Sequence, residues 1–262
     1  MRHHERQPTI RGDPVEQVQE RDGVRASRDG DEGRARCAEQ ARADEMCAEA
    51  FGKRGRHGHI SLSMLPPDHT YQLLRNLTSP VVAVTSERDG KENGMISDSG
   101  VRASIVPTVP RLSVYVHKFN FSHDLIFDSG RFVLHLLHTE QFDLIHQLGF
   151  VSGRNRDKLA HVPHRRGALG APVLDDCYAH FECQVANVMD TGSSTLFLGD
   201  VVEVGFGTAG APRGDVMTAA YFRAHMPVEW RKEYDALLAA AQRAAAEQSR
   251  KIRAVVWRGL EP

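Results

Sequence analysis

The fold is decided by two stretches, CYAHFECQV at residues 177–185 and TLFLGDVVEV at residues 195–204. In each stretch apolar and polar side chains alternate, which is the period of a strand with one buried face. Asp190, Thr191 and Gly192 lie between the two stretches and supply turn residues. The sequence therefore predicts one long antiparallel hairpin, which favours a mainly β fold.

Further strands are predicted on the N-terminal side of this hairpin. PVVAVTS at residues 80–86 is rich in β-branched residues, and Asp89-Gly90 follows it as a strong hairpin turn signal. Only short helices interrupt the strands, so an antiparallel barrel is favoured over parallel βαβ units. The remaining predicted strands are 93–97, 111–116 and 131–137, and a helix is predicted at 140–148.

The two ends of the chain differ from this middle part. Residues 1–63 are rich in charged and small residues without a sustained apolar period, so they predict a disordered low-complexity tail. An Ala-rich helix is predicted from Pro227 to about Ile252, with an apolar stripe that packs on the barrel or, as the alternative, on a partner subunit. We therefore divide the chain into this tail, a folded domain at 64–210 and a C-terminal helical extension at 211–262.

Composition argues against several classes of function. The 262 residues carry 33 Lys and Arg against 34 Asp and Glu, a net charge of -1, which argues against nucleic-acid binding through bulk charge. No apolar run is long enough to span a membrane and no secretory signal is recognised, so we expect a cytoplasmic protein that binds no membrane.

The cysteines and histidines give no metal-site pattern. Cys177 and Cys183 lie on one predicted strand roughly 20 Å apart, so they are expected to be reduced structural thiols. His135, His138 and His146 are interpreted as surface or core side chains, with metal binding as the minor alternative.

The stretch KFNFSHD at residues 118–124 places a cation, an amide and a hydroxyl where a predicted strand gives way to a short helix. Ser122 is predicted to cap this helix, and Ser129-Gly130 to end it. The free amides and the positive end of the helix dipole then face the same ligand as Lys118 and Asn120, which predicts an anion site. The alternative is that Ser122 is only a cap and Lys118 only a solvated strand end.

Taken in order, these segments resemble the flavin reductase-like family, which has the FMN-binding split barrel. The resemblance covers residues 65–206 and rests on the order and spacing of its segments. These are PVVAVT at 80–85, NGM at 93–95, AS at 103–104, K-x-N-x-SHDL at 118–125, SGRF at 129–132, APVL at 171–174, FEC at 181–183 and FLGDV at 197–201.

The resemblance implies a fold and a cofactor. The expected fold is a six-stranded antiparallel split β-barrel with Greek-key topology and short flanking helices, assembled as a homodimer. The expected cofactor is FMN, with FAD as the alternative flavin; the turn at 118–123 would hold its phosphate, and small residues after the second strand would contact its ring. The expected cofactor-binding residues are Ser97, Ser99, Ala103, Ser104, Lys118, Asn120, Ser122 and His123.

The activity implied by the resemblance is that of an NAD(P)H-dependent flavin reductase. A reduced nicotinamide, the co-substrate, would give a hydride to flavin N5 while the protein supplies position and charge. A partner monooxygenase is one expected acceptor of the reduced flavin. The alternatives are a non-catalytic FMN-binding electron carrier or flavin store, and a barrel that has lost its ligand.

Three charged segments have two interpretations each. Arg102 either stabilises charge on the reduced flavin ring or faces solvent. Residues 154–158 and 164–166 either bind the phosphates of the nicotinamide nucleotide or form solvated loops. The chain has no Gly-x-Gly-x-x-Gly fingerprint, so no Rossmann site is predicted for that nucleotide.

Overall fold

The computed structural model describes residues 74, 77, 80–208, 210 and 214–255. The predicted tail at 1–63 lies outside the described residues, as do Cys37 and Cys47. The division of the remaining chain at residue 210 stays a prediction.

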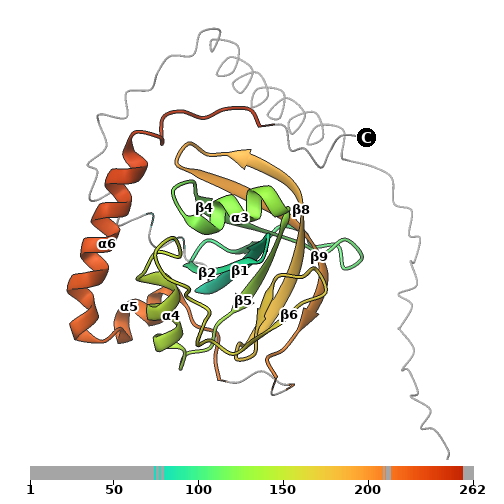
Figure 1. Cartoon of the computed structure of the whole chain (residues 1–262), viewed down its shortest axis with the longest axis horizontal. Coiled ribbons are helices and arrows are strands. Elements are labelled where there is room, and N and C mark those ends of the chain that lie inside the picture. Colours follow the sequence, from blue (N-terminus) through green and yellow to red (C-terminus); the bar gives the residue numbers. More distant parts are fainter. Residues whose placement is uncertain (1–73, 75–76, 78–79, 209, 211–213, 256–262) are drawn as a thin grey trace, which may run out of the picture. The chain divides into compact units, whose positions relative to one another are not determined.

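The centre of the described part is a curled antiparallel sheet, visible in Figure 1, in the order β2-β1-β5-β8-β9-β4-β3. In this part of the chain β2 and β3 are the sheet edges and do not pair with each other, so the sheet is a half barrel. Its strands are β1 (Val82–Arg88), β2 (Lys91–Ser97), β3 (Val101–Arg102), β4 (Arg111–His117), β5 (Arg131–Leu136), β8 (Ala179–Asp190) and β9 (Ser194–Gly205). All of these except the two-residue β3 have six residues or more. A separate two-stranded sheet pairs β6 (His164–Arg166) with β7 (Pro172–Leu174).

The predicted long hairpin is confirmed as β8 and β9, which have 12 residues each. Their register shifts between Glu182 and Cys183 and again between Val185 and Asn187. Such irregularities bend a strand and increase its twist, which explains why the sheet curls here.

The predicted turn after β1 is also confirmed. Asp89 and Gly90 have φ angles of 53° and 78°, and Arg88 pairs with Lys91 on either side of them. Two consecutive residues with positive φ define the type I′ turn that joins twisted antiparallel strands. This turn fixes the register of β2, the strand that forms one edge of the sheet.

The sheet buries one apolar cluster on its inner face and another on its outer face. The inner cluster includes Val82, Phe132 and Phe197, none of which is exposed to solvent. The outer cluster joins Val81 and Ala83 of the first strand region to the helices. Because residues of one strand alternate between the two clusters, the sheet is covered on both faces.

Four helices lie around the sheet in the described residues. They are α3 (Phe121–Ser129), α4 (Phe142–Gly149), α5 (Ala219–His225) and α6 (Val228–Ala246). The first two were predicted from the sequence. The predicted C-terminal helix begins as expected, after Pro227, but it ends at Ala246 rather than near Ile252.

Helix α6 packs on the body of its own chain through only part of its length. None of its 19 residues is buried, although Trp230 and Tyr234 contact the outer cluster. Trp230 stacks on His146 of α4 with ring centroids 4.4 Å apart. Figure 1 shows the N-terminal end of α6 next to α5 and α4.

Cys177 and Cys183 are free and buried, as predicted, although Cys177 precedes β8 instead of lying on it. Burial raises the pKa of the Cys177 thiol to about 12, so it is protonated at neutral pH. No helix in the described residues is both long and apolar enough to cross a membrane.

His135, His138 and His146 are each buried or in contact with other side chains of the protein. Burial lowers the pKa of His135 to about 3, so this side chain is neutral. His138 Nε2 lies 3.1 Å from an Asp176 carboxylate oxygen, and His146 stacks in the outer cluster.

Candidate functional site

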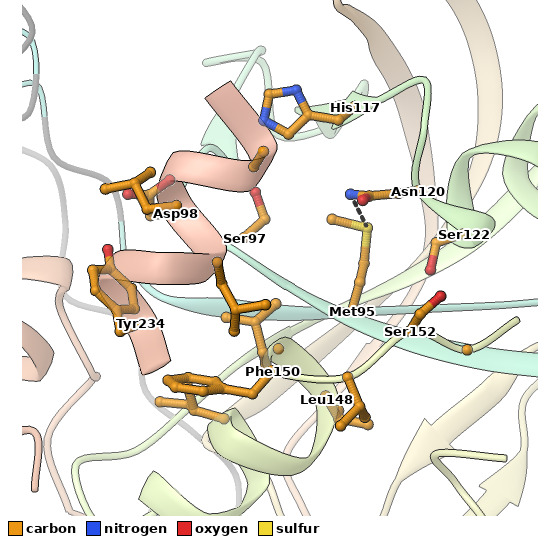
Figure 2. A pocket seen from close by; sticks show the side chains of 18 of the residues that line it. Met95, Ser97, Asp98, His117, Asn120, Ser122, Leu148, Phe150, Ser152 and Tyr234 are labelled. Carbon is orange, nitrogen blue, oxygen red and sulfur yellow. Dashed lines mark hydrogen bonds between the residues drawn. The ribbon is translucent and has the colours of Figure 1, made fainter. Parts of the chain in front are cut away.

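A pocket of about 570 Å³ opens between the sheet and α6. Its walls come from the end of β2, the turn between β4 and α3, the segment after α4, and the helices α5 and α6. Figure 2 shows Asn120 and Ser122 on the side of the β4–α3 turn, Met95 next to Asn120, and Ser97, Asp98 and Tyr234 on the side of α6. The pocket lining therefore combines polar groups from the turn and the end of β2 with apolar side chains from β2, α4 and α6.

The turn between β4 and α3 is built differently from the prediction. Helix α3 begins at Phe121, and its N-cap is Asn120, whose side chain makes no capping hydrogen bond. The prediction that Ser122 is the cap was wrong, because the helix starts early enough to place Ser122 in its first turn. The predicted end is confirmed: Gly130 has a left-handed φ of 68° and donates its N–H to Ile126.

Ser122 is instead part of a buried polar contact. Its side chain is 1% exposed and accepts a 2.8 Å hydrogen bond from Asn93 Nδ2. Gly153 fits closely over the same amide, since a Cβ there would lie 2.1 Å from Asn93 Oδ1. Asn93, Ser122 and Gly153 all line the pocket, and together they join β2, α3 and the loop after α4.

Lys118 does not line the pocket and is not a solvated strand end either. Its Nζ lies 2.7 Å from Asp190 Oδ1, and only 4% of the Asp190 side chain is exposed. Asp190 also accepts the backbone N–H groups of Gly192 and Arg253. Burial alone would raise the pKa of Asp190, but these hydrogen bonds and Lys118 outweigh it and lower that pKa. The positive charge expected to hold a ligand phosphate is thus matched within the protein.

Of the eight predicted cofactor-binding residues, Ser97, Asn120 and Ser122 line the pocket. Asn120 points its Nδ2 at Met95 Sδ, 3.9 Å away (Figure 2). Ser97 Oγ lies 2.7 Å from Ser99 Oγ, so Ser99 contacts a lining residue without lining the pocket itself.

The other predicted residues lie outside the pocket lining. His123 Nε2 lies 2.9 Å from Thr195 Oγ1, and its ring stacks on Phe127. Ala103 and Ser104 lie in the exposed connection between β3 and β4, where both backbone N–H groups bond to the Arg111 carbonyl. Contacts from these residues to a flavin stay a prediction.

Some side chains of the two charged segments are paired within the protein. Arg154 donates to Asp124 at 2.9 Å and lies over the Phe121 ring. Residues 164–166 form β6, and His164 lies 3.1 Å from a Glu92 carboxylate oxygen. Arg102 is exposed, which agrees with its interpretation as a solvent-facing residue.

For several lining residues the sequence did not predict their place in the pocket, although Lys158 belongs to the segment 154–158 considered for nucleotide phosphates. Asn93 belonged to a quoted segment, but only its contact with Ser122 shows what it does. Lys158 is 4% exposed, and its Nζ donates to the Leu148 carbonyl at 2.6 Å. No periodicity or motif marks a lysine in a charged loop as buried. The apolar stripe of α6 was predicted, but its role as a wall of the pocket was not; the wall consists of Tyr234, Leu237, Leu238, Ala240, Ala241 and Ala244.

The comparisons with known proteins match this part of the chain. The family described as flavin reductase like domain matches residues 74–228, from before β1 to the start of α6. The chain belongs to this family. The resemblance inferred from the sequence is therefore confirmed. The matched residues include the pocket lining from the sheet, the β4–α3 turn, α4 and α5, whereas the α6 wall lies beyond them.

The chain covers different shares of the individual proteins to which it is similar. A high molecular weight rubredoxin from Moorella thermoacetica is 30% identical over 151 residues, which are 57% of this chain and 63% of that protein. The reductase subunit of a flavin-dependent monooxygenase from Mycobacterium tuberculosis is 26% identical and covers 67% of this chain and 94% of its own length. A solved FMN-binding protein from Thermus thermophilus is 25% identical with a TM-score of 0.50, and the match covers 62% of this chain and 89% of that one.

Proposed function

We propose that the chain is an NAD(P)H-dependent flavin reductase that binds FMN in the pocket between β2, the β4–α3 turn and α6. The observation that carries this proposal is the position of the pocket. In a member of the flavin reductase like domain family, it opens at the turn for which the sequence predicts an anion site. Its volume of about 570 Å³ lies within the range of cofactor pockets.

The lining residues fit a flavin nucleotide. Ser97, Asn120, Ser122 and Ser152 offer hydroxyl and amide groups that can bond to a ribityl chain, a phosphate or the polar edge of the ring. Met95, Leu148 and the α6 wall offer apolar surface for the ring. When bound, the flavin supplies the hydride chemistry, and the protein holds it and keeps water from it.

The two substrates would use the pocket in different ways. The nicotinamide ring must approach the flavin to within about 3 to 3.5 Å for hydride transfer, which requires an open face of the flavin. The product is a reduced flavin, and a monooxygenase is one protein that could accept it, since one relative is the reductase subunit of such an enzyme.

A single experiment tests this function. The full chain is purified and titrated with FMN, its visible spectrum is recorded, and NADH or NADPH is then added without oxygen. We expect bound flavin absorbance that bleaches with either nucleotide. Bound flavin that does not bleach would indicate an electron carrier or flavin store instead, and failure to bind FMN or FAD would overturn the proposal.

A further inference from the structure

The pocket contains a buried cation that has no anionic partner in the described residues. Lys158 lines the pocket and is 4% exposed. In this part of the chain no carboxylate lies within 4.0 Å of its ammonium nitrogen, and its side chain makes a single hydrogen bond, to the Leu148 carbonyl. Burial lowers the pKa of Lys158 from 10.5 to about 8, so at pH 7 the side chain is still mostly protonated.

One role for Lys158 is structural and accounts for part of this arrangement. Leu148 lies in the last turn of α4, where backbone carbonyls have no partner within the helix and a cation is favoured. An ammonium has three donors, however, and the Leu148 carbonyl uses one of them. Burying a charge is unfavourable unless it is paired, so the two remaining donors and the charge itself call for a ligand.

Lys158 contrasts with Lys118, the lysine that the sequence predicted to be part of an anion site. Lys118 is neutralised by Asp190 and lies outside the pocket lining, whereas Lys158 lies within the lining without a counter-charge. The other titratable residues in the lining are Asp98, His117, Arg223 and Tyr234, and none of them contributes to the pKa shift of Lys158. In Figure 2, Asp98 lies beside α6, on the side of the pocket away from Ser122 and Ser152.

We propose that Lys158 is the residue through which this pocket recognises a negative charge on its ligand. The inference rests on the proposed function and adds a specificity-determining residue to it. A flavin nucleotide offers two such charges, the phosphate group and the ring in its reduced, anionic form. Both are anions that accept hydrogen bonds from an ammonium, and charge-assisted hydrogen bonds of this kind are the stronger ones.

The test compares Lys158→Met, which removes the charge, with Lys158→Arg, which retains it, and with Lys91→Met as a control on an exposed hairpin residue. FMN and riboflavin affinities and the midpoint potential of bound FMN are measured for each. If the phosphate is recognised, Lys158→Met weakens FMN binding at least about tenfold and leaves riboflavin binding unchanged. If the reduced ring is recognised, both oxidised flavins bind as before and the potential becomes more negative.

The pH dependence provides a second readout that does not rely on Lys158→Met folding normally. In the unaltered chain the effect of Lys158 decreases as pH rises through about 8, because the amine loses its charge. Lys158→Arg retains binding and removes this decrease, since arginine stays charged. Lys158→Met with unchanged affinities and potential, together with identical pH profiles for the unaltered chain and Lys158→Arg, would overturn the inference.

Inorganic phosphate separates this inference from the proposed function. Thermal unfolding is measured with phosphate and with chloride at equal ionic strength. We expect phosphate to raise the Tm of the unaltered chain and of Lys91→Met but not of Lys158→Met. If the chain binds no flavin and phosphate still acts through Lys158, the anion site stands and the reductase proposal fails. If the chain binds no flavin and phosphate has no such effect, both fail.

Discussion

At the scale of single residues, Asp190 joins three segments that are distant in sequence. It accepts hydrogen bonds from Lys118, from Gly192 and from the backbone of Arg253. We predict that Asp190→Ala lowers the free energy of unfolding by about 1–3 kcal/mol, because it removes a buried acceptor and leaves its donors unpaired. Urea denaturation at pH 7 measures this, with Asp200→Ala as a control, since the pair of Asp200 with Arg111 is exposed and contributes about 0–1 kcal/mol.

The same carboxylate gives a pH dependence with a definite sign. The pKa of Asp190 is lowered in the folded protein, so its contribution is complete above the unfolded value near 3.8 and is lost as pH falls below it. The stability difference between the unaltered chain and Asp190→Ala should therefore be constant from pH 7 to about pH 5 and shrink in more acidic solution. A difference that instead grows on acidification would contradict this assignment.

The sequence predicted where the site lies better than it predicted which side chains contact each other there. The amide and hydroxyl of Asn120 and Ser122 do line the pocket, because their place in the turn follows from local sequence. The pairing of Lys118 with Asp190 joins residues 72 positions apart, and the burial of Lys158 depends on how its loop packs on α4. Neither fact is local, so no pattern in the sequence could reveal it.

At the scale of elements, α6 depends on a small aromatic contact. Trp230 stacks on His146 and meets Phe150, and none of these contacts involves the far half of the helix. We predict that Trp230→Ala loosens α6 and weakens FMN binding about three- to tenfold, although Trp230 itself is not in the pocket lining. Fluorescence titration with FMN and limited proteolysis of α6 measure the two effects.

Val228→Ala on the same helix serves as the matched control, because Val228 is 77% exposed and should affect neither property. If Trp230→Ala binds FMN as tightly as the unaltered chain does, then the position of α6 does not contribute to FMN binding.

Elements were the most predictable level of the structure. The long hairpin and the turn at Asp89-Gly90 follow from side-chain alternation and from residues that tolerate positive φ, both of which are properties of neighbouring residues. Packing of the α6 stripe on its own chain was predicted, and Trp230 and Tyr234 do contact the outer cluster, but an apolar stripe alone does not predict that the helix borders a pocket.

At the scale of the whole molecule, one apolar surface has no covering within the described residues. Val202, Val204 and Phe206 follow one another at alternate positions at the end of β9 and are 53%, 60% and 46% exposed. We propose that this surface contributes to a homodimer. We predict that the full chain sediments as a dimer at micromolar concentration and that Val204→Asp raises the dissociation constant at least about tenfold, since a charge would be buried there.

Sedimentation equilibrium of Val228→Asp, which adds the same charge to an exposed position on α6, controls for net charge. A monomeric unaltered chain, or equal weakening by both substitutions, would contradict the proposed interface.

The α6 wall has a consequence for how the pocket of this chain can be altered. The polar groups of the pocket come largely from the sheet and the β4–α3 turn, whereas part of its apolar lining comes from a helix that follows the sheet in sequence and has no buried residue. Substitutions along that helix can therefore reshape the apolar side of the pocket, where we propose that FMN binds, at little cost to folding. Changes confined to α6 offer a direct route to engineered variants of this chain in which the apolar side of the pocket differs while the sheet and the β4–α3 turn stay the same.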